Sequence, residues 1–137
     1  MAVRRVTPQE AKTLMDEGYV YVDVRSIPEF EKGHPPGSYN VPLLHMGPSG
    51  MSPNPEFAAV MEKTFPKETR LIVGCKMGGR SAQASQLLES LGYRDVVDQK
   101  GGFEGQPGNP GWQPAGLPVA TQAPPDHTYE ALRTRAR

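Results

Sequence analysis

The sequence contains little cysteine, no net charge and no long apolar run, and each of these shortages excludes a class of protein. Its one cysteine, Cys75, cannot form a disulfide within the chain, which excludes a disulfide-stabilised scaffold and suits a reducing compartment. Fifteen Lys and Arg residues balance fifteen Asp and Glu residues, so net charge gives no argument for binding nucleic acid or an anionic membrane. No stretch approaches the ~20 apolar residues of a membrane-spanning helix, and the first residues lack the apolar segment of a signal peptide. We therefore expect a soluble, cytoplasmic protein that binds neither membrane nor nucleic acid.

Glycine and proline, in contrast, are abundant, with 15 of each among 137 residues, so turns and loops must occupy much of the chain. The length suits one domain with a core of its own. We expect this domain over residues 1–120 and a C-terminal extension over 121–137, for which a mobile form is one alternative. For the last stretch, 126–137, a short basic helix and a disordered terminus remain equal alternatives.

Apolar residues recur at helical spacing in some segments and as short continuous runs in others. Thr7 begins the sequence Thr-Pro-Gln-Glu, which predicts a capping box with proline at the first helical position. Ser81 is expected to cap a later helix that Gly92 ends. We expect helices over residues 7–18, 54–65 and 81–92, a single helical turn over 29–32, and strands over 19–24, 38–41, 70–74 and 95–98. Helices that alternate with short apolar strands indicate an α/β domain with a mostly parallel sheet.

Two Gly/Pro-rich segments show no clear periodicity. Residues 44–53 are expected to form a loop that helps to shape a pocket entrance. Residues 101–125 are expected to lie extended over the core, with Trp112 and Leu117 as anchors. Neither segment predicts a regular element.

The only cysteine lies in the loop Cys75–Ser81, with the sequence CKMGGRS, between a predicted strand and a predicted helix. Ligands of α/β folds bind at this end of the strands, and the amide groups of such a loop add to the positive end of the next helix. We expect Gly78 and Gly79 to take the positive φ angles that such a curl needs, and Arg80 supplies a forked cation. Helix N-termini and adjacent cations lower the pKa of cysteine thiols in general to roughly 3.5–7.5, so we expect a thiolate here.

The alternative to a reactive thiol is a small buried core residue, which is the better interpretation of most lone cysteines. Glycines, an arginine and a serine within six positions favour a nucleophile instead. A phosphatase loop would place its arginine six positions after the cysteine, where Ser81 stands, and a disulfide reductase would need a second cysteine. One cysteine and the three scattered histidines, His34, His45 and His127, do not form a metal site, so we expect neither metal nor cofactor.

The loop and two further motifs resemble those of the rhodanese family of sulfurtransferases. Residues 75–81 are similar to the family's Cys-x-x-Gly-x-Arg loop and the serine that follows it. Residues 22–42, VDVRSIPEFEKGHPPGSYNVP, are similar to its second signature, and GGF…W…GLPV over 101–119 resembles its closing motif. The resemblance implies a rhodanese-like α/β fold with a mainly parallel five-stranded sheet and helices on both faces.

The same resemblance implies that Cys75 accepts a sulfane sulfur as a persulfide and passes it to a thiol or to cyanide. It assigns substrate binding to the rest of the loop, namely to Lys76, Met77, Gly78, Gly79, Arg80 and Ser81. The loop amides would hold the charged sulfur, while Arg80 and Lys76 would attract an anionic donor. The cation at position 76 is similar to the thiosulfate-using members rather than to the mercaptopyruvate-specific ones.

Four polar residues of the second motif, Asp23, Arg25, Glu29 and His34, are expected to have structural roles, because charged groups at strand ends usually satisfy loop backbone. We expect an ion pair between Arg25 and Glu29, and His34 as a hydrogen-bonded brace.

Two functions remain open from the sequence. The first is a thiosulfate sulfurtransferase that acts on small molecules. The second is a sulfur-relay or interaction module, with a protein persulfide donor or acceptor as its partner and little turnover of small molecules.

Overall fold

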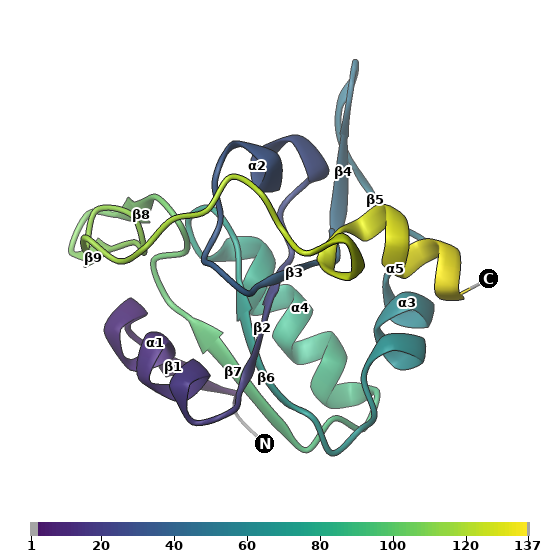
Figure 1. Cartoon of the computed structure of the whole chain (residues 1–137), viewed down its shortest axis with the longest axis horizontal. Helices are drawn as coiled ribbons and strands as arrows, with labels where there is room; N and C mark the ends of the chain where they lie inside the picture. Colours follow the sequence, from purple (N-terminus) through teal and green to yellow (C-terminus); the bar gives the residue numbers. More distant parts are fainter. Residues whose placement is uncertain (1–2, 137) are drawn as a thin grey trace.

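The computed structural model describes residues 3–136, so parts of the predicted ranges at residues 1, 2 and 137 lie outside it. Its centre is a sheet in the order β1-β7-β6-β2-β3, and every pair of neighbouring strands in it is parallel (Figure 1). The strands are β1 (Arg4–Val6), β2 (Val20–Asp23), β3 (Tyr39–Asn40), β6 (Arg70–Gly74) and β7 (Asp95–Gln99). The α/β class with a five-stranded parallel sheet is therefore confirmed.

Helices cover both faces of this sheet because successive strand residues point to opposite sides. Leu71 and Val73 of β6 belong to one buried cluster, and Ile72 between them belongs to the other. The larger cluster also takes in α3, α4 and α5, while the smaller one takes in α1 and the segment after β7 (Figure 1). The helices are α1 (Pro8–Asp16), α2 (Ile27–Lys32), α3 (Phe57–Thr64), α4 (Gly79–Ser90) and α5 (Tyr129–Ala136).

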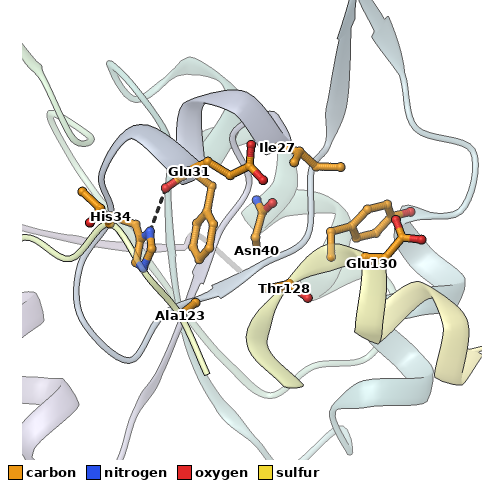
Figure 2. Close-up of a pocket in the computed structure, with 10 residues that line it drawn as sticks. Ile27, Glu31, His34, Asn40, Ala123, Thr128 and Glu130 are labelled. Carbon is orange, nitrogen blue, oxygen red and sulfur yellow. Dashed lines mark hydrogen bonds between the residues drawn. The ribbon is translucent and has the colours of Figure 1, made fainter. Parts of the chain in front are cut away.

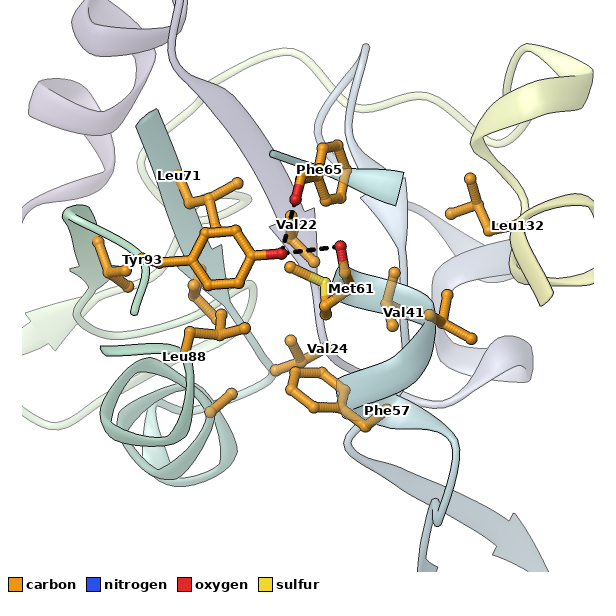
Figure 3. Close-up of a cluster of buried hydrophobic side chains, with 14 of the residues drawn as sticks. Val22, Val24, Val41, Phe57, Met61, Phe65, Leu71, Leu88, Tyr93 and Leu132 are labelled. Atoms are coloured by element: carbon orange, nitrogen blue, oxygen red, sulfur yellow. Dashed lines mark hydrogen bonds between the residues drawn. The ribbon is translucent and has the colours of Figure 1, made fainter. Parts of the chain in front are cut away.

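Tyr93 is a buried member of the larger cluster (Figure 3). The hydroxyl of Tyr93 lies 2.8 Å from the carbonyl oxygens of both Met61 and Phe65, at the end of α3. The Met61 carbonyl also accepts the Phe65 amide at 2.9 Å, so the tyrosine adds a second donor at the last turn of the helix and supplies one to the Phe65 carbonyl that follows it. The contact fixes α3 against the turn between α4 and β7.

Of the two predicted helix N-caps, the structure confirms Thr7 and contradicts Ser81. At Thr7 the capping box is confirmed: its hydroxyl accepts from the Glu10 amide at 3.1 Å, and the Glu10 carboxylate accepts from the Thr7 amide at 2.8 Å. At Ser81 the prediction is wrong, because α4 begins at Gly79 with Gly78 at its N-cap. The backbone turn at Gly78 starts the helix three residues earlier than a cap at Ser81 would.

Residues 44–53, expected as a loop, form a β-hairpin instead. Strands β4 (Leu44–Gly47) and β5 (Gly50–Pro53) pair antiparallel, with Met46 opposite Met51, and the hairpin projects from the body of the protein (Figure 1). The positive φ of Gly50, 104°, fits the tight turn between the two strands. A projecting hairpin adds little to the core, so it leaves no apolar pattern by which the sequence could reveal it.

The segment after β7 lies over the smaller cluster, as expected. It contains a short hairpin of β8 (Gly105–Gln106) and β9 (Asn109–Pro110), and the side chain of Trp112 behind it is fully buried. The Trp112 indole donates to the Pro118 carbonyl at 2.6 Å, and Leu117 packs beside it. Trp112 and Leu117 are thus confirmed as the anchors of this segment.

Of the two alternatives for the C-terminal stretch, the structure shows the helix. A short 3₁₀ turn, η1 (Pro125–His127), leads into α5, which lies beside α3 (Figure 1). Tyr129 and Leu132 are buried in the larger cluster, and the Tyr129 hydroxyl accepts from the Asn54 amide group at 3.0 Å. In the described part of the chain, no helix is long and apolar enough to cross a membrane.

Candidate active site

Cys75 directly follows β6, at the edge of the sheet where the parallel strands end. Its side chain is only 2 % exposed, and its sulfur accepts a hydrogen bond from the Gly78 amide at 3.0 Å. The helix α4 begins with the next residue, so its positive end faces the same sulfur. The strand end, the amide and the helix together favour negative charge on Cys75.

Backbone shape at Gly78 makes this contact possible. Its φ is +116°, a conformation that strains any residue with a Cβ atom. Gly79, which was expected to share this role, has no positive φ and is the first residue of α4. One glycine rather than two therefore turns the loop.

A second glycine, Gly102, packs directly against the backbone of the loop. A Cβ atom on Gly102 would lie 2.5 Å from the Cys75 carbonyl oxygen, too close for any side chain. The next amide, of Phe103, donates to that oxygen at 2.6 Å, and the Glu104 amide donates to the Lys76 carbonyl at 2.9 Å. The segment after β7 thus holds the backbone of the cysteine loop in place.

Ser81 lies inside α4, with its hydroxyl directed at the cysteine rather than at the helix end. Its Oγ is 3.6 Å from Cys75 Sγ, 3.1 Å from the Gly78 carbonyl and 2.6 Å from Asp98 Oδ1. Ser81 and Asp98 are both buried. The serine therefore connects the thiol to a carboxyl group on β7.

Arg80 and Glu29 form a two-pronged ion pair, with nitrogen–oxygen distances of 2.7 and 3.0 Å. Burial opposes ionisation of Glu29, but hydrogen bonds from Arg80 and Ser26 outweigh it and lower its pKa to about 2. The expected pair between Arg25 and Glu29 is wrong. The carboxylate of Glu29 instead contacts Arg80 on α4.

Arg25 pairs with Asp23 instead, at the end of β2. Its Nη2 lies 2.7 Å from Asp23 Oδ2 and 2.6 Å from the Gly33 carbonyl, and the guanidinium stacks 4.4 Å above the Phe103 ring. Both charged side chains are almost completely buried. This pair joins β2, α2 and the segment after β7.

His34 contacts two backbone carbonyls through its ring nitrogens. Nδ1 lies 2.7 Å from the Phe30 carbonyl and Nε2 lies 3.2 Å from the Gln122 carbonyl, and the ring stacks on Phe30 at 3.8 Å. Its backbone also pairs with Ala120. These contacts connect the end of α2 to the chain leading to α5.

Lys76 and Met77 have the more exposed side chains of the loop. The Lys76 ammonium lies 3.9 Å from Glu104, with about half of each side chain exposed, and Met77 is 50 % exposed. Lys76 also lines a pocket of about 300 Å³ together with Glu29, Lys32 and Met46. Met46 belongs to the hairpin β4–β5, so this hairpin forms part of the pocket wall.

A second pocket, of about 440 Å³, lies between α2 and the start of α5 (Figure 2). Apolar side chains such as Ile27 and Phe30 form much of it, and Glu31 and Glu130 stand at its rim. Among its lining residues in the described chain there is none from the cysteine loop. The larger of these two pockets is therefore not the one that Lys76 of the cysteine loop lines.

Sequence analysis missed two charged residues at the site, Asp98 and Arg5. Asp98 lies in β7, and its Oδ2 accepts from Arg5 Nε on β1 at 3.1 Å. The polar residues Asp98 and Gln99, which follow the apolar pair Val96 and Val97 at the end of the strand, were the available signal. Over residues 3–136, no group of three or more His, Cys, Asp or Glu side chains could hold a metal ion.

Comparison with known proteins identifies the class. The sequence model described as "Rhodanese-like domain" matches residues 7–106, and the chain therefore belongs to the rhodanese family. Thiosulfate sulfurtransferase 16, chloroplastic, of Arabidopsis thaliana is 40 % identical over 109 residues, covering 80 % of this chain and 86 % of that protein. Thiosulfate sulfurtransferase 18 of the same plant is 34 % identical over 72 % of this chain and 74 % of its own length.

Other relatives carry names that state no reaction. Senescence-associated protein DIN1 of Raphanus sativus is 40 % identical over 68 % of this chain, which spans about half of that protein. The crystal structure of Rv0390 from M. tuberculosis superposes with a TM-score of 0.76, at 25 % identity, over 89 % of this chain and all of its own. The rhodanese-like fold is thus shown both by sequence and by structure.

Proposed function

We propose that this protein is a sulfurtransferase that carries sulfur as a persulfide on Cys75. The observation that supports this most strongly is the hydrogen bond from the Gly78 amide to the Cys75 sulfur at the start of α4. This arrangement stabilises negative charge both on a thiolate and on a transferred sulfur. Two relatives named thiosulfate sulfurtransferase support thiosulfate as the donor.

In the proposed reaction, the Cys75 thiolate attacks the outer sulfur of thiosulfate. The new S–S bond forms the persulfide, and the old S–S bond breaks with its electron pair leaving on sulfite. A thiol or cyanide then attacks the outer sulfur of the persulfide and regenerates the thiolate. No metal or cofactor is needed for either step.

The two cations of the loop have different places in this proposal. Two of the five N–H donors of Arg80 are engaged with Glu29, so the remaining three are available to an anionic donor. Lys76 is more exposed and lines the pocket of about 300 Å³. We assign Arg80 to holding the loop and the donor, and Lys76 to attracting the donor from solution.

The second candidate, a sulfur relay to a partner protein, is favoured by exposed methionines near the loop. Met46 and Met77 are each about half exposed, and Met46 shares a pocket with Lys76. Flexible methionine side chains suit adaptable protein contacts. A protein persulfide donor or acceptor would then replace the small molecule at the same cysteine.

Intact mass after exposure to thiosulfate tests the shared chemistry. We expect the wild-type protein to gain one sulfur atom and Cys75→Ala to gain none, with no loss of folding. Appreciable thiosulfate turnover by Cys75→Ala would overturn the proposal. Turnover of thiosulfate and cyanide, compared with a panel of protein persulfide donors, separates the enzyme from the relay.

Compartment and domain limits also remain proposals. A free thiol nucleophile suits the reducing cytoplasm, although relatives bear the names chloroplastic and mitochondrial. We place the rhodanese domain at residues 1–120 and the extension at 121–137.

A further inference from the structure

The carboxyl group of Asp98 is buried beside the cysteine loop and has no part in the sulfur chemistry described above. Only 2 % of its side chain is exposed. Burial raises the pKa of Asp98, and the hydrogen bond from Ser81 and the charge of Arg5 offset that effect only in part. A buried carboxyl group of this kind is able to exchange a proton with a neighbour.

Its neighbour Ser81 has one hydroxyl proton, two oxygen acceptors and one thiol donor around it. The acceptors are Asp98 Oδ1 at 2.6 Å and the Gly78 carbonyl at 3.1 Å, and the Cys75 thiol donates to the Ser81 oxygen at 3.6 Å. The hydroxyl can donate to only one of the two acceptors at a time, while its oxygen accepts from the thiol. When Asp98 is ionised, its carboxylate accepts the Ser81 proton across the 2.6 Å contact. The oxygen of Ser81 is then free to accept the thiol proton of Cys75.

We propose that Asp98 is a positioning residue that receives the proton of Cys75 through Ser81. The S–H bond of Cys75 breaks as its proton forms an O–H bond on Ser81, and the original Ser81 proton passes to Asp98 Oδ1. Afterwards the protonated Asp98 donates to Ser81, and Ser81 donates to the thiolate. The inference rests on the proposed function only in that the thiolate is the form that accepts sulfur.

The exchange leaves the total charge of the site unchanged, which is why it is feasible in a buried place. One negative charge moves from Asp98, beside Arg5, to Cys75, where the Gly78 amide already points at the sulfur. Arg5 is also close to that loop, 3.8 Å from the point where a Gly78 Cβ atom would stand. Among the described residues, Tyr21 from β2 interacts with both Cys75 and Asp98, and Arg80 from α4, which pairs with Glu29, interacts with Cys75. Asp23 interacts in turn with Tyr21 and Arg80.

A purely structural role makes a different prediction. Asp98 could serve only to join β1 to β7 through Arg5 and to hold α4 through Ser81. Its replacement would then change stability without changing the pH profile of the cysteine. Through-space repulsion alone would change the profile, but equally with or without the Ser81 hydroxyl.

The test is the rate of Cys75 alkylation by iodoacetamide as a function of pH. We expect two inflections in the wild-type protein, because coupled groups lose their protons in two shared steps. Asp98→Asn, a carboxamide that imitates the protonated acid, should give a single inflection at a lower pH than the upper wild-type step. A difference of about one pH unit corresponds to a tenfold change in the ratio of thiolate to thiol.

A double-mutant cycle separates the relay from simple repulsion. In the Ser81→Ala background, Asp98→Asn should move the profile by less than half as much as it does alone. Asp95→Asn is the matched control, since Asp95 lies at the other end of β7 and pairs with Tyr19. An unchanged profile in Asp98→Asn, or an equal displacement in both backgrounds, would overturn the relay.

A second measurement does not depend on how Asp98 variants fold. The ¹³C chemical shift of the Asp98 carboxyl group should titrate in two steps in the wild-type protein and in one step in Cys75→Ala, because the coupling is reciprocal. Identical curves in the two proteins would contradict the proposal. Neither assay involves sulfur transfer. If both assays support the proton relay but the protein does not react with thiosulfate, only the proposed function is refuted.

Discussion

Arg80 and Glu29 hold each other by two hydrogen bonds, so the arginine of the cysteine loop is bound to α2 before any donor arrives. The side chains are each only 15 % exposed, which limits screening by solvent and salt. The pair thus connects the start of α2, the start of α4 and the loop between β6 and α4.

The Arg80–Glu29 pair should make folding stability depend on pH in the acid range. The pKa of Glu29 falls from 4.5 to about 2 on folding, so the stabilisation is complete above pH 4.5 and is lost as pH falls through 2. The difference corresponds to about 3 kcal/mol. Chemical denaturation between pH 2 and 7 measures it. Glu29→Gln should remove this part of the slope, whereas Glu31→Gln, on an exposed site of the same helix, should keep it.

Gly78→Ala should lower both stability and cysteine reactivity. The added Cβ atom would make only ordinary van der Waals contacts, the nearest at 3.7 Å, but φ of +116° costs a residue with a Cβ atom about 1–2 kcal/mol. Relief of that strain would turn the amide away from the Cys75 sulfur. Thermal unfolding and the iodoacetamide rate measure the two effects. Gly79→Ala is the control, because this glycine is helical and has open space around it. If the two variants had the same stability and the same iodoacetamide rate, Gly78 would have no special role at the site.

Arg80→Ala should reduce kcat/KM for thiosulfate roughly ten- to a hundredfold, because a charge-assisted contact of about 1.5–3 kcal/mol is lost. Arg80→Lys should retain more activity, since it keeps the charge without the fork. Lys76→Ala should cost less, because its ammonium is half exposed. Steady-state kinetics at several salt concentrations checks these roles. Salt should lower kcat/KM more in the wild type than in Lys76→Ala, and equal slopes would contradict steering by Lys76.

Leu132→Ala should destabilise the whole protein by about 2–5 kcal/mol, because its side chain is buried in the larger cluster. Denaturant unfolding followed by tryptophan fluorescence measures it, since Trp112 lies in the other cluster and reports whether the protein unfolds as one unit. Arg135→Ala, on an exposed position of the same helix, should change stability by less than ~0.5 kcal/mol. No loss in Leu132→Ala would mean that α5 is dispensable for the fold.

Features that depend on neighbours in the chain were predictable from the sequence. The capping box at Thr7 involves residues three apart, and the alternation of helices and strands follows from local apolar spacing. The predicted strand before the cysteine loop and the predicted helix after it place the loop at the edge of the sheet where the parallel strands end. The α/β fold and the region of the site were therefore determined by the sequence itself.

Tertiary structure decided the partners of the charged groups. Glu29 and Arg80 are 51 residues apart, Arg5 and Asp98 are 93 apart, and Arg25 had two carboxylates near it in the sequence. Which of these meet depends on the order of the strands and on where each helix begins, and Coulomb attraction carries no record of chain distance. The start of α4 depended likewise on a glycine conformation, +116° at Gly78, that only the packed loop requires.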